Sequence, residues 1–256
     1  MNHLDYEKNL ETFLKQSLAT DATDSSNLNS NDATFDDTIT DLDYRDIFKG
    51  RIFTRDDENY KSFSSFTKMV SKVDWVYETQ DIVAFKILRA LRNNFRRTGR
   101  LSQDQDRLLD VGSRFKSTLY FAQLFNNGVV CVEATPNTHS QVGCTLTMPF
   151  NSVLGMQSMH AEAQNLPIQS ESLSFITSLH AIEHFGLGKY SDSIDYYGDQ
   201  KGLREFYRVL APGGIIICSV PSEDIQSYVE FHGQRIYNPS DFDLIMRDCG
   251  FEPLED

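Results

Sequence analysis

The chain has 256 residues, of which 40% are hydrophobic and 24% are charged, as is ordinary for a globular protein. Its net charge of −13 is unevenly spread, because residues 1–60 carry 6 basic and 14 acidic side chains while the remainder carries 18 and 23. A chain this acidic has no general attraction for nucleic-acid phosphates, so nucleic acid is excluded as an expected partner.

Cysteine spacing and hydropathy set two further limits. The four cysteines lie far apart without a C-x-x-C pair, so neither a zinc knuckle nor a disulfide framework is predicted. The N-terminus has no apolar signal core, and no stretch approaches the roughly 18 apolar residues of a membrane-spanning helix. We therefore expect a cytoplasmic protein that does not insert into a membrane.

Residues 1–43 are predicted to form an acidic leader. Within it, residues 4–18 place apolar side chains roughly at helical spacing, which is compatible with a short helix. Residues 20–43 consist mostly of Asp, Ser, Asn and Thr, which bury too little apolar area to offset the entropy cost of ordering. The leader is therefore expected to be largely disordered, and its deletion is expected to leave thermal stability almost unchanged.

Residues 44–104 are rich in aromatic side chains and are predicted to form a helical appendage on the main domain. Asp81 is the expected N-cap of a helix whose apolar face includes Phe85 and Leu88. Basic side chains flank this face, and basic amphipathic helices can bind membranes or RNA. The preferred interpretation is a solvated face beside a buried one for these residues: Lys86, Arg89, Arg92, Arg96, Arg97 and Arg100.

From residue 105 onward, predicted strands and helices alternate. The strands cover residues 108–111, 128–133, 173–179 and 215–220, and the helices cover residues 117–125, 201–210 and 239–249. This alternation predicts an α/β fold over residues 105–256, with a doubly wound, mostly parallel sheet of the Rossmann type. Residues 250–256 begin another strand, so a sheet of six or seven strands is expected.

The turn after the first of these strands is a candidate ligand site. Gly112 follows the strand directly, and the absence of a Cβ lets its backbone approach a ligand closely. The helix that follows offers backbone N–H groups at its N-terminus. A dinucleotide fingerprint would need glycine at Arg114 and Ser117, so a pyrophosphate binder of the usual kind is not predicted. Taken alone, the turn is equally compatible with a purely structural role.

Glu133 ends the next predicted strand, 23 residues after Asp110. An acidic residue about 20 residues beyond a nucleotide-binding turn can accept hydrogen bonds from both ribose hydroxyls. The alternative is a surface glutamate at a strand end. The spacing favours the ribose-binding role.

Several segments of this region together resemble the class I S-adenosylmethionine (SAM) methyltransferases, in particular the type 11 group. The strand before Gly112 resembles their first motif, and the strand that ends in Glu133 resembles their ribose-binding strand. The run that starts at His180 is also similar to a little-characterised family first catalogued in nematodes. The segments that carry the resemblance are residues 108–113, 131–133, 160–167, 175–184 and 203–214.

The resemblance implies SAM as the cofactor and indicates which residues bind it. Glu162 replaces the usual aspartate that reaches the adenine amino group, and the guanidinium of Arg114 suits the methionine carboxylate. The implied cofactor-binding residues are Asp110, Gly112, Ser113, Arg114, Glu133, Glu162, Ala163 and Ser178.

His180, Glu183 and His184 follow the predicted strand 173–179 and are the candidate catalytic residues. By residue type, the histidines are candidate general bases and the glutamate is their orienting partner. The same letters, His-x-x-Glu-His, spell an inverted zinc-protease motif. Because the motif begins at a strand end, helical spacing of the two histidines is not assured, and no metal site is predicted. A loop lining that never touches substrate is a further alternative.

The sequence therefore predicts a SAM-dependent methyltransferase that acts on a hydroxyl of a small molecule or glycan. The segment from Gly186 to Gly202 is long, polar and bracketed by glycine, as a lid would be. Lys189, Tyr190 and Asp192 within it are expected to contact substrate. Two other functions stay open, namely a catalytically inactive methyltransferase-like binding protein and a zinc hydrolase that uses the two histidines.

Overall fold

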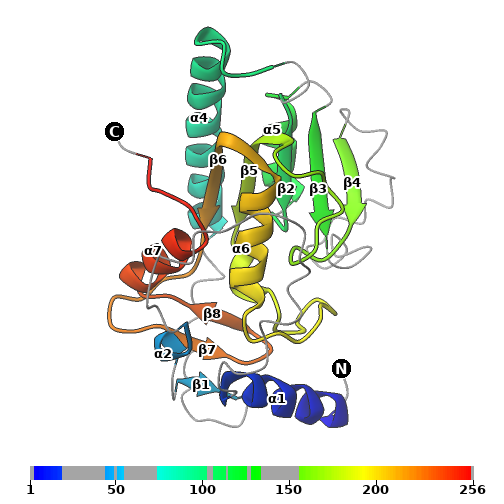
Figure 1. The fold of residues 1–256 in the computed structure, drawn as a ribbon, viewed down its shortest axis with the longest axis vertical. Coiled ribbons are helices and arrows are strands. Elements are labelled where there is room, and N and C mark those ends of the chain that lie inside the picture. Colours follow the sequence, from blue (N-terminus) through cyan, green and yellow to red (C-terminus); the bar gives the residue numbers. More distant parts are fainter. Residues whose placement is uncertain are drawn as a thin grey trace.

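The computed structural model describes residues 3–18, 44–48, 51–54, 74–102, 106–113, 115–125, 128–133 and 156–254. Its centre is a parallel sheet of five strands in the order β4-β3-β2-β5-β6 (Figure 1). These strands are β2 (Leu108–Val111), β3 (Val129–Glu133), β4 (Met156–His160), β5 (Leu173–Leu179) and β6 (Leu210–Ser219). The chain winds outward from β2 to β4 and then returns to place β5 on the other side of β2. This is a doubly wound, Rossmann-like sheet, and the predicted fold class is confirmed.

Helices cover both faces of this sheet because the side chains of its strands alternate between two apolar clusters. Leu108 and Phe175 belong to one cluster with residues of α4 (Asp74–Arg97) and α5 (Phe115–Ala122). Leu109 and Ile176 belong to the other cluster with residues of α6 (Gly198–Val209) and α7 (Pro239–Asp248). In Figure 1, α5 and α6 accordingly lie on opposite sides of the strands.

A second, smaller sheet lies beyond the carboxyl ends of the parallel strands (Figure 1). It joins β1 (Ile52–Phe53) in parallel to β7 (Tyr228–Glu230), which pairs in antiparallel fashion with β8 (Gln234–Ile236). None of its strands was predicted from the sequence. It faces the edge of the large sheet where the candidate catalytic residues lie.

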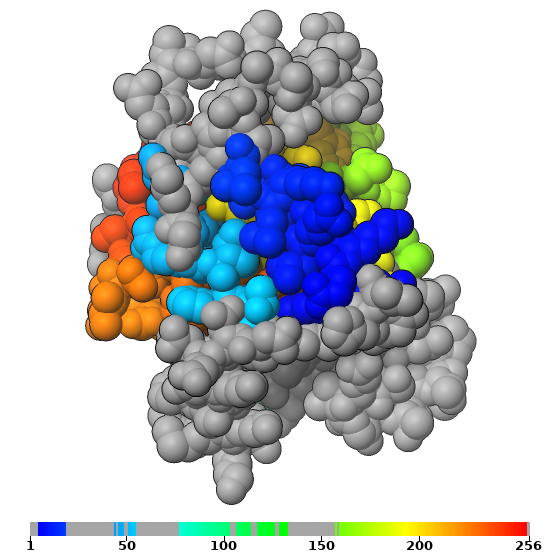
Figure 2. All heavy atoms as spheres, turned by 90° about the horizontal axis from the view of Figure 1, so that it is seen from below, coloured from blue at the N-terminus to red at the C-terminus, as the bar shows by residue number. Residues whose placement is uncertain are grey.

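The N-terminal helix α1 (His3–Leu18) is packed against the rest of the chain and agrees with the short helix expected over residues 4–18. Tyr6 and Phe13 are buried, and the Phe13 ring lies 5.1 Å from the rings of both Tyr196 and Phe231. Figure 2 shows α1 extended over the lower face of the molecule, beside the segment that holds α2 (Tyr44–Phe48) and β1. Residues 19–43, the polar part of the predicted leader, lie outside the described residues.

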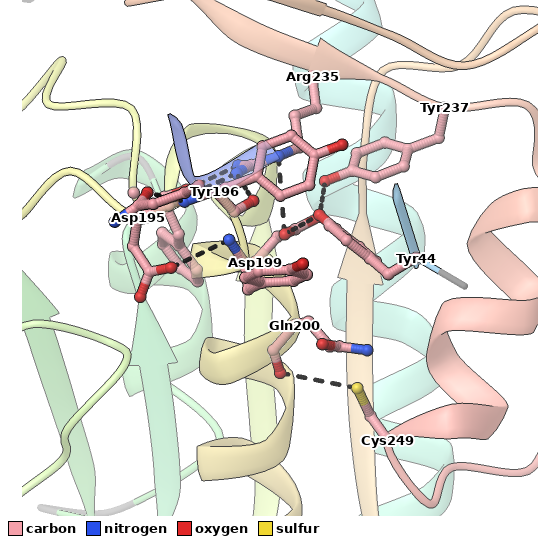
Figure 3. A network of polar contacts seen from close by, with 12 residues as sticks. Tyr44, Asp195, Tyr196, Asp199, Gln200, Arg235, Tyr237 and Cys249 are labelled. Carbon is pink, nitrogen blue, oxygen red and sulfur yellow. Dashed lines mark hydrogen bonds and ion pairs between the residues drawn. The ribbon is translucent and has the colours of Figure 1, made fainter. Parts of the chain in front are cut away.

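A wholly buried polar network ties α2 to α6 and β8 (Figure 3). Asp199 accepts hydrogen bonds from the hydroxyls of Tyr44 and Tyr237, the second over 2.8 Å. Arg235 lies 3.6 Å from Asp199 and donates to the backbone oxygens of Phe185, over 2.6 Å, and Tyr196, over 2.8 Å. Asp199 and Arg235 are thus paired with each other, which offsets the cost of burying their charges. Arg235 also holds the backbone at both ends of the segment from Phe185 to Tyr196, which follows the candidate catalytic residues.

Helix α4 differs from its prediction in where it begins. It starts at Asp74 rather than after Asp81, and Asp81 is a buried residue inside the helix that accepts a 2.6 Å hydrogen bond from Ser117. Part of its basic flank is paired with an acidic residue, since Arg92 is buried and forms two 2.6 Å hydrogen bonds with Asp106.

None of the described helices is long and apolar enough to cross a membrane.

The number of strands also differs from the prediction. Residues 251–254 follow α7 without forming a strand, so the large sheet has five strands in the described residues rather than six or seven. The ring of Phe251, in this segment, instead packs against the ring of Tyr207 of α6, with the ring centroids 5.5 Å apart. The predicted division of the chain at residues 43 and 104 stays a prediction.

Candidate functional site

The carboxyl ends of four adjacent parallel strands bring the predicted site residues to one edge of the sheet. Glu133 ends β3 and pairs in register with His160, which ends β4. Gly112 follows β2, and His180 follows β5. The strand order reverses between β2 and β5, and ligands of open α/β sheets bind in the crevice outside such a reversal. The edge between Gly112 and His180 is therefore where a ligand is expected.

Gly112 has a backbone conformation that only glycine adopts without strain. Its φ is +68°, and a Cβ built on it would lie 2.7 Å from the Cβ of Ala181. Its N–H donates to the carbonyl oxygen of Val132 over 3.1 Å. The turn is thus held against both neighbouring strands, and the missing side chain is a steric requirement.

Asp110 is buried, and its carboxylate is bonded within the protein. Thr177 donates to one oxygen over 2.7 Å, and Thr118 donates to the other. Burial raises the pKa of Asp110, and the hydrogen bonds from neighbouring hydroxyls partly offset that rise. Asp110 therefore joins β2 to β5 and α5, two residues before the turn at Gly112.

Ser113 and Ser178 connect the two strand ends directly. The hydroxyl of Ser113 accepts the backbone N–H of Leu179 over 3.2 Å, and the hydroxyl of Ser178 donates to the carbonyl oxygen of Val111 over 3.2 Å. Both side chains are buried. Their hydrogen bonds hold β2 and β5 in a fixed relation at the point where the order of strands reverses.

Three of the remaining predicted cofactor residues, Glu133, Glu162 and Ala163, lie at or just after the ends of β3 and β4. The backbone of Glu133 ends β3, and Arg114 is outside the described residues. Glu162 follows β4 and accepts two hydrogen bonds from Ser193, from its hydroxyl over 2.9 Å and from its N–H over 3.2 Å. Ala163 is buried beside it. The predicted adenine-binding position is thus linked to the segment that was predicted to be a lid.

His180 and Glu183 form a close pair directly after β5. His180 has a left-handed backbone with a φ of +54°, which is uncommon for a residue with a side chain and recurs at functional sites. Its Nδ1 lies 3.4 Å from Oε1 of Glu183, whose side chain is 2% exposed, whereas that of His180 is 26% exposed. The buried carboxylate can therefore orient a more accessible imidazole.

His184 has a different environment from His180. Its Nδ1 lies 2.7 Å from the carbonyl oxygen of Gly233, which requires a proton on Nδ1, and its Nε2 lies 3.7 Å from Glu183. Burial lowers the pKa of His184 to about 4, although the nearby carboxylate of Glu183 favours the charged form. His184 is therefore neutral at neutral pH.

Within the described ranges, no group of three or more His, Cys, Asp or Glu side chains is arranged to hold a metal ion. His180 precedes the short 3-10 helix η3 (Ile182–His184), so the two histidines do not lie one turn apart on an α-helix. The zinc alternative therefore gains no support from the geometry of these residues.

Sequence reasoning missed two residues at this site. The ring of Tyr77, from the first turns of α4, packs edge-on against His180 with the ring centroids 5.3 Å apart. Gly233, in the turn between β7 and β8, supplies the carbonyl oxygen that binds His184. Both lie far from β5 in the sequence, so no motif spacing could have indicated them.

Residues 145–255 match the family described as "Caenorhabditis protein of unknown function, DUF268". The predicted resemblance to a family first catalogued in nematodes is confirmed. No curated protein sequence matches the chain. The DUF268 match spans the segment that runs through β4, β5 and β6 to the end of α7, and so it includes the candidate catalytic residues.

Several solved structures are similar to this chain in fold. The cyclase SpnF is 19% identical with a TM-score of 0.46, and the match covers 58% of this chain and 53% of that one, about half of its length. A methyltransferase from Burkholderia thailandensis, solved with S-adenosylhomocysteine, is 17% identical with a TM-score of 0.48 and 77% coverage of each chain. A SAM-dependent methyltransferase from Thermotoga maritima is 18% identical with a TM-score of 0.44, covering 76% of this chain and 82% of that one.

Proposed function

We propose that this chain is a SAM-dependent methyltransferase that transfers a methyl group to a hydroxyl of a small molecule or glycan. The observation that carries the proposal is the juxtaposition at the reversal of strand order. There, the left-handed turn at Gly112 lies beside the end of β5, which His180 follows, and the strand on the other side, β3, ends in Glu133. Each of these residues belongs to a segment whose sequence resembles the class I methyltransferases.

The residues at the strand ends fit SAM better than they fit a dinucleotide. Gly112 gives the turn after β2 a left-handed backbone, and its missing Cβ leaves room for Ala181. The chain has no second and third glycine of the kind that a pyrophosphate requires, and SAM has no phosphate. The residues that would hold it are those of the turn, Gly112 to Arg114, together with Glu133 and Glu162. When bound, SAM supplies an electrophilic methyl group on a sulfonium.

The pair of His180 and Glu183 supplies the base that a hydroxyl acceptor requires. With Nδ1–H of His180 directed to the Glu183 carboxylate, Nε2 carries the lone pair that can accept the proton of the acceptor hydroxyl. The carboxylate then stabilises the imidazolium that forms, as in other base-orienter pairs. The distance of 3.4 Å is long for a hydrogen bond, and such pairs often tighten only when substrate binds.

His184 is assigned a positioning role rather than that of the base. A group with a pKa of about 4 accepts a proton poorly at neutral pH, and its Nδ1–H is committed to Gly233. Through this bond His184 joins η3 to the turn between β7 and β8. It therefore fixes Glu183, its neighbour in the sequence, relative to the second sheet.

A methyl-transfer assay tests the proposal. The purified chain is incubated with SAM that carries a tritiated methyl group and, in separate reactions, with monosaccharides, alditols, phenols, primary amines and carboxylic acids. We expect label to enter the hydroxyl compounds, and we expect His180→Ala to lower turnover about 10²–10⁴-fold while SAM affinity stays near normal. Transfer to amines or carboxylates instead would contradict the hydroxyl acceptor. Binding of SAM without transfer to any compound would favour the catalytically inactive alternative.

A further inference from the structure

Two buried carboxylates near η3 each have one oxygen without a hydrogen-bond partner among the described residues. They are Oε2 of Glu183 and Oε1 of Glu230, in side chains from η3 and β7. The two residues are 2% and 6% exposed. A buried carboxylate oxygen without a donor is costly, so native proteins retain one where a ligand or a mechanism uses it.

Lys189 is a positively charged neighbour of both carboxylates. Its Nζ lies 3.5 Å from Nδ1 of His184 and 5.4 Å from the centre of the Tyr190 ring. Desolvation lowers the pKa of Lys189, and attraction to Glu183 and Glu230 opposes this shift. No ion pair within 4.0 Å joins Lys189 to either carboxylate in the described part of the chain. The ammonium of Lys189 therefore lies near the two carboxylates without forming a salt bridge with either of them.

The buried carboxylate of Asp199 differs from these two carboxylates in its hydrogen bonding. Asp199 is equally buried, but both of its oxygens accept hydrogen bonds from tyrosine hydroxyls and Arg235 lies beside it. In the same protein, then, one buried acid is fully satisfied and two others keep a free acceptor. One of the two unsatisfied acids, Glu183, lies next to the base of the proposed reaction, because it is also the partner of His180.

We propose that Glu183, Glu230, Lys189 and Tyr190 bind a neutral, polyhydroxylated part of the methyl acceptor, such as a monosaccharide or another polyol. This inference rests on the proposed methyltransferase function and specifies the acceptor class. Hydroxyl groups donate to the two free carboxylate oxygens and accept from the Lys189 ammonium, and the Tyr190 ring offers an apolar surface.

Charge disfavours anionic acceptors at this cluster. A carboxylate or phosphate would meet two carboxylates, which Lys189 alone opposes. A neutral polyol satisfies the free acceptors without adding charge. Because Glu183 belongs both to this cluster and to the pair with His180, a hydroxyl bound at Glu183 lies near the base.

The first experiment compares melting temperatures of variants without any ligand. Burial raises the pKa of Glu230, so the folded protein favours a neutral group there. Gln also retains an acceptor oxygen for the side-chain amide of Gln234, which lies 3.4 Å from Glu230. We expect Glu230→Gln to raise the melting temperature by a few degrees, and the matched Asp199→Asn to lower it. A lower melting temperature for Glu230→Gln would show that its charge serves the fold, and this would overturn the proposal.

The second experiment adds probes to the same melting assay. Glucose, galactose, mannose and myo-inositol form the polyol arm, and ethanolamine and spermidine form the amine arm. We expect at least one polyol to raise the melting temperature of the wild type, and we expect Glu230→Gln and Lys189→Met to lose this shift. A shift with amines alone, no shift with any polyol, or an equal polyol shift in both variants would overturn the assignment.

Titration with S-adenosylhomocysteine separates this inference from the proposed function. If the wild type fails to bind it, the methyltransferase proposal fails. The shifts in melting temperature with polyols still test whether the cluster binds a polyol. If S-adenosylhomocysteine binds equally to the wild type and to Glu230→Gln but no polyol shift appears, the cofactor site stands and the acceptor class is wrong.

Discussion

Nδ1 of His180 lies 3.4 Å from the buried carboxylate of Glu183, at the carboxyl end of the strand where the order of the sheet reverses. The strand end fixes His180 through a left-handed backbone and a 3.0 Å hydrogen bond from its N–H to Ser219. The second sheet fixes the neighbour of Glu183, His184, through Gly233. The pair thus links the parallel sheet, which carries the predicted cofactor residues, to the small sheet.

Replacement of Gly112 by Ala is expected to destabilise the fold by about 2–4 kcal/mol, because a left-handed backbone and a clash with Ala181 both add to the cost. The double variant Gly112→Ala with Ala181→Gly removes the clash and keeps the backbone strain. Denaturant unfolding of both proteins should therefore recover only part of the loss in the double variant. Full stability of Gly112→Ala alone would mean that the turn adapts and is not sterically fixed.

Phe13→Ala is expected to destabilise the protein by about 3 kcal/mol, since Phe13 of α1 is fully buried against Tyr196 and Phe231. Leu18→Ala is the matched control, because Leu18 belongs to the same helix and is 80% exposed. Its effect should stay within about 0.5 kcal/mol. Equal small effects in both variants would show that α1 adds little to stability, as the sequence alone had indicated.

Stability is expected to fall as pH is lowered from about 6.5 to about 4. In this window an unfolded His184 binds a proton, whereas the folded protein keeps this imidazole neutral because burial lowers its pKa to about 4. The full contribution, on the order of 3 kcal/mol, is therefore present above pH 6.5 and lost as pH falls through the folded value. Melting temperatures measured across this range should decline less steeply in His184→Asn, which keeps a donor for Gly233. An identical slope in that variant would assign the decline to other groups.

Local sequence patterns located four of the five strands of the parallel sheet, and only β4 was not predicted as a strand. The strand Leu173–Leu179 matches its predicted bounds because seven consecutive buried residues are framed by polar ones. Helix α7 begins at Pro239 as predicted, since proline suits the first turn and Asn238 caps it. Both elements are defined by residues that are neighbours in the sequence.

Contacts between distant segments could not be predicted in the same way. The strands β7 and β8 have three residues each and include charged side chains, so their periodicity is too short to recognise. In α1 the buried hydrophobic residues are Tyr6 and Phe13, with Leu10 partly buried beside them, and so short an apolar face does not indicate where the helix packs. The same holds for the candidate site. Its motif residues were predicted from the sequence, whereas Tyr77 of α4 and Gly233 of the second sheet, which contact them, were not.

The measurement that tests the account most directly is calorimetric titration of the wild type, Glu133→Ala and Glu11→Ala with S-adenosylhomocysteine. Glu11 is an exposed glutamate of α1, far along the chain from the strand ends, and serves as the control. We expect one molecule to bind to the wild type and to Glu11→Ala with equal affinity, and we expect Glu133→Ala to lose about 1–3 kcal/mol of binding free energy. The absence of binding to the wild type, or equal binding to the folded Glu133→Ala variant, would contradict a SAM site at the edge between Gly112 and His180.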